Sequence, residues 1–375
     1  MRDKLDPLII GDLEIKIPII QGGMGVRVSL APLAAAVANC GAAGTIASVG
    51  LPDPDAPETL KDVPAACCKE FIKDMKAARE LSDGAIGVNI MVALGNYEEM
   101  VKATINEDID YIVSGAGLPI SLPEFAEGSS AKLIPMLSSA RGAAVILKTW
   151  KRRYNRLPDA IIVEGPLSGG HIATLSVEEL RALGSKLREK PRLEESIKDV
   201  VKLVSEYEKD YGVSIPVIAA GGIFDGKDIA KFFKLGAKGV QLGSRFVTTE
   251  ECSVAQEFKD LYINSTEEDL AYIQSPVGMP AKVIRTKFID AILKGEKKPI
   301  DCSYICLRTC DPNEAHFCIA RALVSAARGD IDNAIVLAGS NVSRITKIVP
   351  VQELIDELVS GTLAELNKET VDNRQ

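Results

Sequence analysis

The chain has 375 residues, of which 46% are hydrophobic, 26% charged and 5% aromatic. This length suits one large α/β domain with additions or two ordinary domains, and the hydrophobic fraction excludes disorder for most of the chain. With 44 Lys and Arg against 52 Asp and Glu, the formal net charge of −8 argues against a nucleic-acid or anionic-membrane partner.

Eight short apolar runs without period-two alternation predict buried parallel strands. In chain order they are Ile17–Ile20, Gly44–Ser48, Ala85–Ile90, Tyr111–Val113, Lys132–Leu137, Ala160–Val163, Pro216–Ala219 and Gly239–Leu242. Amphipathic helix patterns lie between them: one follows Ser29 as its expected N-cap, and another begins after Asp225 and ends at Gly236. Eight strand–helix units within about 265 residues predict an α/β fold of the (β/α)8 TIM barrel type, with a doubly wound sheet as the rival.

We expect residues 1–264 to form the barrel and residues 265–375 to form a loop and helical extension packed on it, a candidate lid. The segment 176–211 is longer than one crossover needs, and it is expected to be an elongated helical segment after the sixth strand. Because the strand–helix alternation stops near residue 264, residues 265–345 are expected to form loops and short helices. A final amphipathic helix is expected from Val351 to Val359.

In a barrel, the loops after the carboxyl ends of the strands form the active-site face. These predicted loops are rich in glycine, which lets backbone amides approach a flat or anionic ligand closely, although such loops are often glycine-rich in any case. They contain Gln21–Gly25, Asn89, Ser114–Gly117, Glu164–His171, Ala220–Gly222 and Gly243–Arg245. The glycines after the last two strands stand where barrels often bind phosphate. Arg245 either adds charge there or forms an ion pair at the rim.

The chain has two histidines, His171 and His316. His171 follows a Gly-Gly pair beyond the sixth strand, seven residues after Glu164. Imidazole is the side chain best matched to proton transfer near neutral pH, so His171 is the candidate catalytic residue, with an ordinary loop histidine as the alternative. His316 is expected to be structural.

Four of the eight cysteines form a spaced run, Cys302-x3-Cys306-x3-Cys310-x7-Cys318. On a helix the first three would share one face, and metal or iron–sulfur ligation is one interpretation. Ligand sets usually contain an x2 pair, which this run lacks, so ordinary buried thiols are the favoured interpretation and no metal ligand is assigned. Sparse cysteines and no signal peptide indicate reduced thiols in a cytoplasmic protein, and no uncharged run reads as a membrane span.

Together these motifs resemble the nitronate monooxygenase family, formerly called 2-nitropropane dioxygenases, which also contains flavin-dependent enoyl-acyl-carrier-protein reductases. The matching stretches are Pro18–Gly25, Gly87–Asn89, Ser168–His171, Pro216–Gly222, Gln241–Phe246 and Ser275–Pro280. The resemblance spans about residues 8–290. The sequence departs from the common pattern before the Gly-His pair, where many members have Glu-Ala or Ala-Gly, and in the added segments 176–211 and 302–318. These differences bear on the substrate more than on the cofactor.

The resemblance implies FMN held non-covalently at the barrel mouth. By motif, Gly22–Met24 would lie against the isoalloxazine ring with Asn89 at its polar edge, and Gly222 with Gly243–Ser244 would hold the phosphate. The full set of expected cofactor-binding residues is Gln21, Gly22, Gly23, Met24, Asn89, Glu164, Gly169, Gly170, Ala220, Gly221, Gly222, Gln241, Gly243 and Ser244. His171 would face the flavin across the substrate pocket.

The first expected function is FMN-dependent oxidation of small alkyl nitronates by O2 to a carbonyl compound and nitrite, with His171 as the base for neutral nitroalkanes. The second is NAD(P)H-dependent reduction of an enoyl thioester through the same flavin. The third is a sensing barrel that uses Cys302–Cys318 as a metal or redox element. In each enzymatic case the partner is a small molecule, and a homodimer is the oligomeric state considered.

Overall fold

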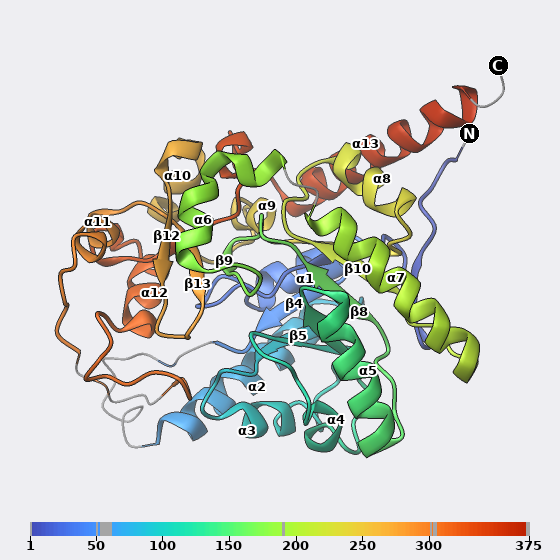
Figure 1. The fold of residues 1–375 in the computed structure, drawn as a ribbon, viewed down its shortest axis with the longest axis horizontal. Helices are drawn as coiled ribbons and strands as arrows, with labels where there is room; N and C mark the ends of the chain where they lie inside the picture. The colour runs from blue at the N-terminus through green and yellow to red at the C-terminus, as the bar shows by residue number, and fades with distance from the viewer. Residues whose placement is uncertain are drawn as a thin grey trace.

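The computed structural model describes residues 2–49, 52, 62–189, 192–300, 302 and 306–372 (Figure 1). All eight predicted strands are present in one parallel sheet of order β3-β11-β10-β8-β7-β6-β5-β4. They are β3 (Ile19–Gln21), β4 (Gly44–Ala47), β5 (Ile86–Met91), β6 (Tyr111–Gly115), β7 (Lys132–Leu137), β8 (Ile161–Glu164), β10 (Val217–Ala220) and β11 (Gly239–Leu242). The sheet closes because Ala43 N donates to Ile19 O and Gln21 N donates to Ala43 O, each at 2.9 Å. The fold is therefore a (β/α)8 TIM barrel.

Helices follow the strands of the barrel along the chain (Figure 1). They are α1 (Ala31–Asn39), α2 (Val63–Leu81), α3 (Tyr97–Lys102), α4 (Leu122–Phe125), α5 (Ala140–Tyr154), α6 (Val177–Leu183), η2 (Gly184–Glu189), α7 (Arg192–Tyr211), α8 (Gly226–Lys234) and α9 (Ser244–Val247). The ends of α8 are as predicted. The Asp225 side chain accepts from the N–H groups of Lys227 and Asp228, and Gly236 follows the helix with φ of +102°.

The start of α1 differs from the prediction. Leu30, not Ser29, occupies the N-cap position, and it makes no side-chain cap bond. The carboxylate of Asp74 on α2 accepts from Ala31 N at 3.1 Å instead. Ser29 is fully buried, and its Oγ accepts from Met24 N at 2.9 Å. A tertiary contact thus replaces the expected local cap, and Ser29 stabilises the loop after β3.

An antiparallel hairpin of β1 (Leu8–Ile10) and β2 (Leu13–Ile15) covers one end of the barrel. Its apolar side chains share a core with side chains from the barrel interior, among them Ile20 and Tyr111. The hairpin lies at the amino ends of the strands, because Leu8 packs against Gly239, the first residue of β11. Ligand access is therefore left to the carboxyl ends.

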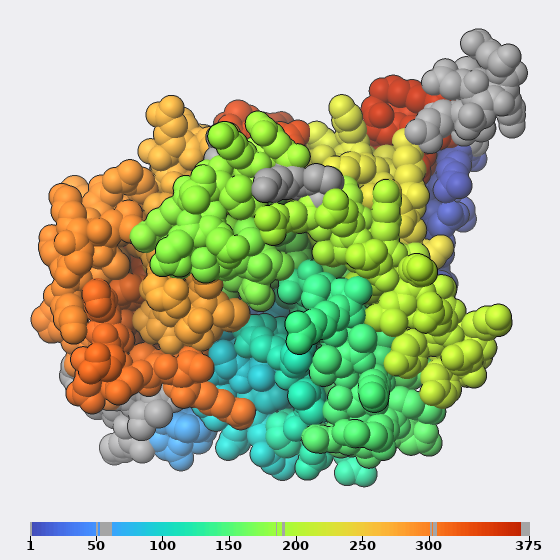
Figure 2. Space-filling model, in the orientation of Figure 1, coloured from blue at the N-terminus to red at the C-terminus, as the bar shows by residue number. Residues whose placement is uncertain are grey.

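The region after α9 contains a small antiparallel sheet that the sequence analysis did not predict. Its strands are β12 (Leu270–Gln274), β13 (Pro280–Ile284), β14 (Val336–Leu337) and β9 (Gly170–His171), which pairs with β13. The other elements are α10 (Gln256–Asn264), η3 (Glu267–Asp269), α11 (Lys287–Leu293), α12 (Ile319–Ala327), η4 (Ile331–Asn333) and η5 (Val342–Arg344). The expectation of loops and short helices over 265–345 was therefore incomplete. Figure 2 shows the orange surface of this region lying against the green surface of the segment that follows β8.

The last helix, α13 (Val351–Asp372), packs on the barrel itself. It contacts both α8 and α1, which is the place of the eighth outer helix of the barrel. A Cβ on Gly226 of α8 would lie 2.2 Å from the backbone of Gly361, so these two glycines allow the helices to cross closely. We therefore propose 256–345, rather than 265–375, as the extension. Within the described part of the chain, no helix is long and apolar enough to cross a bilayer.

Candidate active site

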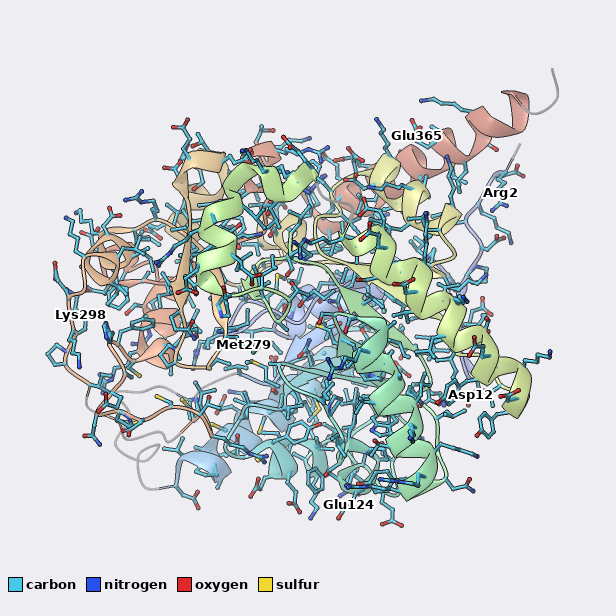
Figure 3. The ribbon with its side chains drawn as sticks, viewed as in Figure 1. Arg2, Asp12, Glu124, Met279, Lys298 and Glu365 are labelled. Carbon is cyan, nitrogen blue, oxygen red and sulfur yellow. The ribbon has the colours of Figure 1, made fainter. Side chains whose placement is uncertain are left out.

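A cavity of about 450 Å³ opens at the carboxyl ends of the barrel strands. It is lined by loops that follow β3, β8, β10 and β11, by the ends of β5 and β7, and by residues of the extension such as Met279. Met279 lies toward the middle of the molecule in Figure 3. All the residues expected to bind cofactor line this cavity except Gln21, and His171 lines it as well. Motifs that lie more than 200 residues apart in the chain thus meet at one site.

Gln21 is the predicted residue that the structure does not bring to the cavity. It is fully buried, its Nε2 donates to Ser29 Oγ at 2.7 Å, and its Oε1 accepts from Thr45 N at 2.9 Å. The Gln21 amide therefore bonds to other protein groups, and these bonds hold the loop after β3 in position. Gln21 is a positioning residue for that loop rather than part of the cavity wall.

Close packing at two glycines makes part of the cavity wall a backbone surface. A Cβ on Gly23 would lie 2.3 Å from the Cβ of Asn89, so no larger residue fits between the loop and β5. Gly221 has φ of +92°, and a Cβ there would lie 2.8 Å from Gly165 O. A flat or anionic ligand can therefore approach backbone N–H groups at these two loops.

Three polar side-chain atoms that line the cavity have no hydrogen-bond partner within the described part of the chain. They are Ser168 Oγ, Thr174 Oγ1 and Gln241 Oε1, and all three are buried. An unpaired buried polar atom costs about 1–3 kcal/mol, and native proteins keep few of them. These atoms indicate that a ligand with hydrogen-bonding groups belongs in the cavity.

His171 faces the cavity from β9, where it pairs with Ala281 of β13. Its Nε2 lies 2.9 Å from Ser275 Oγ, on the turn between β12 and β13. Burial lowers the pKa of His171 from 6.5 to about 4, because the imidazolium loses its hydration. The imidazole is therefore neutral at neutral pH, with one nitrogen held by the extension.

Two further titratable groups lie beside the histidine strand. Glu164 ends β8 on the cavity wall, and burial raises its pKa to about 7, opposed by the charge of Lys282. Lys282 of β13 is fully buried, and burial lowers the pKa of its ammonium to about 7. Its Nζ donates to Pro166 O at 3.0 Å and to Ser340 Oγ. Lys282 thus joins the loop after β8 to the loop after β14.

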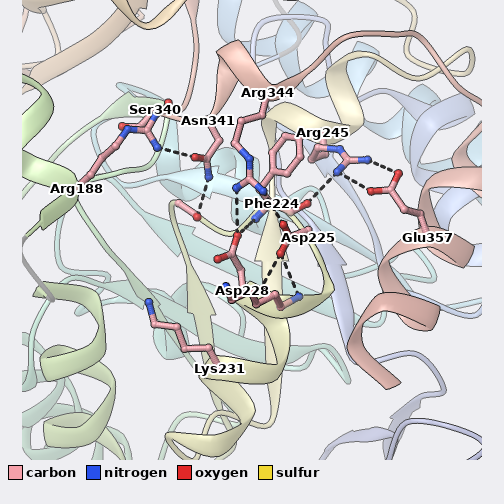
Figure 4. A network of polar contacts seen from close by, with 12 residues as sticks. Arg188, Phe224, Asp225, Asp228, Lys231, Arg245, Ser340, Asn341, Arg344 and Glu357 are labelled. Atoms are coloured by element: carbon pink, nitrogen blue, oxygen red, sulfur yellow. Dashed lines mark hydrogen bonds and ion pairs between the residues drawn. The ribbon is translucent and has the colours of Figure 1, made fainter. Parts of the chain in front are cut away.

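The loop after β14 is also tied to the two loops expected to hold phosphate. Asn341 Nδ2 donates to Gly222 O at 2.8 Å, and Gly339 N donates to Ser244 Oγ at 3.0 Å. Arg188 in turn donates to Asn341 Oδ1 at 2.7 Å (Figure 4). The extension therefore fixes the positions of the loops after β10 and β11.

For Arg245 the sequence allows either a phosphate contact or an ion pair at the rim of the barrel. Its guanidinium donates to the carboxylate of Glu357 on α13 at 2.8 Å and to Phe224 O at 2.9 Å (Figure 4). The same group lies 4.3 Å from the centre of the Phe224 ring. The ion pair is thus formed, and Arg245 also borders the cavity.

The described residues of the cysteine run, 302 and 306–318, do not form the helix that was one interpretation of its spacing. Cys306 and Cys310 lie in turns and irregular chain, and Cys318 is the N-cap of α12. All four thiols are free and half-buried, not fully buried. No three His, Cys, Asp or Glu side chains of the described residues are arranged to hold a metal ion. His316 lines a separate cavity of about 390 Å³ beyond Ser275.

The sequence analysis missed the residues that the extension brings to the site. The stretch Ser275–Pro280 had been noted as similar to the family, so Ser275 had a signal but no assigned role. Lys282 and Asn341 were assigned no role, because each reaches its partner only through contact between distant segments. A lysine within an apolar strand is the one cue that could have pointed to Lys282.

The structure is similar to solved oxidoreductases over nearly its whole length. FabK from Thermotoga maritima has a TM-score of 0.73 and 27% identity, covering 95% of this chain and 96% of that chain. Nitroalkane oxidase from Streptomyces ansochromogenes has a TM-score of 0.69, covering 95% of this chain and 98% of that chain, but at 19% identity it shares the fold alone.

Curated relatives are similar at the same level of identity. A (3aS,4S,5R,7aS)-5-hydroxy-7a-methyl-1-oxo-octahydro-1H-indene-4-carboxyl-CoA dehydrogenase of Mycobacterium tuberculosis is 29% identical, covering 76% of this chain and 67% of the relative. A similar dehydrogenase of Rhodococcus jostii is matched over 64% of its length. A probable nitronate monooxygenase of Staphylococcus aureus is 28% identical, covering 76% of this chain and 79% of the relative.

The barrel, its glycine-lined mouth and these neighbours define the class of protein, a flavin-dependent oxidoreductase. The model of one family, described as nitronate monooxygenase, matches residues 6–361. The chain belongs to the nitronate monooxygenase family.

Proposed function

We propose that the cavity at the barrel mouth binds FMN. The residues present fit this group: the wall is a backbone surface at Gly23 and Gly221, and Gln241 Oε1 and Ser168 Oγ are buried acceptors without a partner among the described residues. A volume of about 450 Å³ is within the range of cofactor and ligand pockets. FMN, when bound, supplies the electron transfer of the reaction.

Two groups of residues would hold the cofactor. Gly22 and Gly23, with Asn89 beside them, would accommodate the flat ring against the end of β5. Gly222 and Ser244 would hold the phosphate, supported by the loop after β14 that bonds to both. Backbone N–H groups and a helix start suit an anion without requiring a free cation.

We propose nitronate oxidation by O2 as the reaction, and the observation that carries it is the neutral imidazole of His171 at the cavity wall. A neutral base can accept the proton next to the nitro group of a nitroalkane. The imidazolium formed then lies beside the nitronate anion, and this attraction offsets the burial that otherwise disfavours the charge. Ser275 holds Nε2 at 2.9 Å and so fixes the ring orientation.

The test compares His171→Ala with the unmodified enzyme on two substrates, a neutral nitroalkane and its preformed nitronate, by oxygen uptake. General-base catalysis contributes about 10²–10⁴-fold to the rate. The kcat/KM for the neutral nitroalkane should therefore decrease by about 10²–10⁴-fold in His171→Ala. The nitronate has already lost its proton, so its oxidation should fall much less. Flavin content, measured in both proteins, should be the same. Equal losses on both substrates, or no oxygen uptake by the flavin-loaded enzyme, would contradict this function.

Reduction of an enoyl thioester by NAD(P)H is the second candidate. It is favoured by the apolar side chains that the extension adds to the cavity, including Leu323, Ile335 and Leu337, which suit an acyl chain. The similarity to FabK and to the carboxyl-CoA dehydrogenase points the same way. Anaerobic NAD(P)H should then bleach the flavin, and an enoyl thioester should restore its colour. A flavin that NAD(P)H does not reduce would exclude this candidate.

A further inference from the structure

Two of the three unpaired polar atoms that line the cavity lie beside loops that are proposed to hold FMN. Ser168 packs against the loop after β10, because a Cβ on Gly221 would lie 3.2 Å from Ser168 N. Gln241 lies beside the loop after β3, because a Cβ on Gly22 would lie 3.7 Å from the Gln241 side chain. The cofactor can therefore supply the missing partners of these two residues.

The third atom, Thr174 Oγ1, belongs to a different segment. Thr174 follows His171 by three residues, on the chain that leads from β9 to α6, and both residues line the cavity. This segment is separate from the loops after β3, β10 and β11. The Thr174 hydroxyl is therefore a feature of the part of the cavity wall that carries the candidate base.

The backbone is held on both sides of Thr174. Ile172 N donates to Pro280 O at 2.8 Å, which continues the contact of β9 with β13. Ile172 and Leu175 are both buried in an apolar cluster with Leu180 of α6. A backbone fixed in this way limits the directions in which the Thr174 hydroxyl can find a partner.

The Thr174 oxygen is buried, and it has no hydrogen-bond partner among the described residues. A hydroxyl that is removed from water without gaining a new partner is unfavourable, and native proteins keep few of them. Because a hydroxyl can donate as well as accept, an oxygen acceptor on a bound molecule would satisfy it.

We propose that Thr174 is a substrate-binding residue whose hydroxyl donates a hydrogen bond to an oxygen of the substrate held beside His171. The identity of this oxygen rests on the function proposed above: it belongs to the nitro or nitronate group, or, for an enoyl thioester, to the carbonyl. The nitro oxygens lie two bonds from the carbon that gives its proton to His171. As that proton leaves, negative charge develops on these oxygens, and the bond from Thr174 becomes stronger.

The first experiment removes the hydroxyl while keeping the shape of the side chain. Thr174→Val lacks the hydroxyl, and Thr174→Ser retains it. Thr104→Val is the matched control, since the buried Thr104 hydroxyl donates to Val101 O at 2.7 Å and Thr104 does not line the cavity. Oxygen uptake by the FMN-loaded proteins gives KM and kcat for a preformed nitronate.

A hydrogen bond to a charged acceptor corresponds to about 10–100-fold in affinity, so Thr174→Val should raise the KM for the nitronate by about that factor. Thr174→Ser should keep the KM of the unmodified enzyme, because it keeps the donor. Thr104→Val should keep it as well.

A second measurement does not require turnover. Propanoate has the same planar pair of oxygens as a nitronate, and its binding to each FMN-loaded protein can be followed by the change in the flavin absorption spectrum. The Kd for propanoate should also rise by about 10–100-fold in Thr174→Val. The Kd for FMN, measured by fluorescence titration, should be the same in all four proteins.

Equal propanoate Kd values for Thr174→Val and Thr104→Val would overturn the role of Thr174. Weaker binding of FMN by Thr174→Val would overturn it too, because the hydroxyl would then belong to the cofactor. A failure of nitronate oxidation gives a different result: the unmodified enzyme would take up no oxygen, while Thr174→Val would still bind propanoate more weakly. The acceptor would then be the thioester carbonyl.

Discussion

Two buried titratable side chains, Lys282 on the small sheet of the extension and Glu164 at the barrel mouth, interact electrostatically. Both side chains have pKa values moved to about 7 by burial, in opposite directions from their usual values. The ammonium of Lys282 bonds to Pro166 O and to Ser340 Oγ, so it holds two loops that border the cavity. Removing such a group leaves its partners unpaired, which costs more than the bonds contribute on balance.

Lys282→Met should change how the free energy of unfolding depends on pH, because it removes a buried group whose pKa is lowered by folding. Above pH 7 the unfolded chain keeps a proton on Lys282 up to about pH 10.5, whereas the folded chain releases it. Raising the pH through this interval therefore favours the folded state of the unmodified protein but not that of the variant. From pH 7 to pH 9 the unfolding free energy of the unmodified protein should rise by about 2 kcal/mol more than that of Lys282→Met.

Denaturant unfolding at several pH values measures this difference. Lys287→Met is the control, because Lys287 is exposed and forms a surface ion pair with Asp332. Parallel pH curves for the unmodified protein and Lys282→Met would show that Lys282 stays protonated in the folded state.

The cavity residues on short loops after the strands could be predicted from the sequence. These loops are rich in glycine, and the alternation of strands and helices shows where each loop lies. Gln21, which was also expected there, does not line the cavity. A side chain at the end of a strand can point either into the site or toward the loop that follows. The bonds of Gln21 to Ser29 and Thr45 decide this, and they depend on the closed sheet. Ser275, Lys282 and Asn341 acquire their roles only from contacts over long sequence separations.

The eight barrel strands could be predicted because each is covered on both faces and therefore reads as an apolar run. The extension could not, because β9 and β14 have two residues each and carry no periodic signal. β9 becomes a strand only by pairing His171 with Ala281 of β13. The same pairing brings Ser275 to the histidine.

The crossing of α8 and α13 can be tested by a single added methyl group. Gly226→Ala would place a Cβ 2.2 Å from the backbone of Gly361, and overpacking of this kind costs about 1–3 kcal/mol. We expect a lower Tm. Gly142→Ala on α5 is the matched control, since its Cβ would have no neighbour nearer than 3.7 Å and alanine favours a helix. A Tm for Gly226→Ala equal to that of Gly142→Ala would contradict the close crossing.

In the whole molecule, the barrel supplies the expected flavin loops and the extension holds two of them in place. Asn341 contributes one such bond, to Gly222 O. Asn341→Ala should weaken FMN binding by about fivefold, since one hydrogen bond contributes about 1 kcal/mol. Flavin fluorescence titration measures the Kd. Asn333→Ala is the control, because the exposed side chain of Asn333 bonds to Asp330 and does not line the cavity. Equal Kd values for the two variants would show that the extension does not support the phosphate loops.

FMN in the cavity at the barrel mouth is the central proposal for this protein. The most direct measurement is the absorption spectrum of the purified chain after incubation with FMN and desalting, with the flavin then released by denaturation and quantified. We predict flavin absorption bands and about one FMN per chain, in line with one cavity that the glycine loops form. A colourless protein that retains no FMN after this treatment would contradict the account.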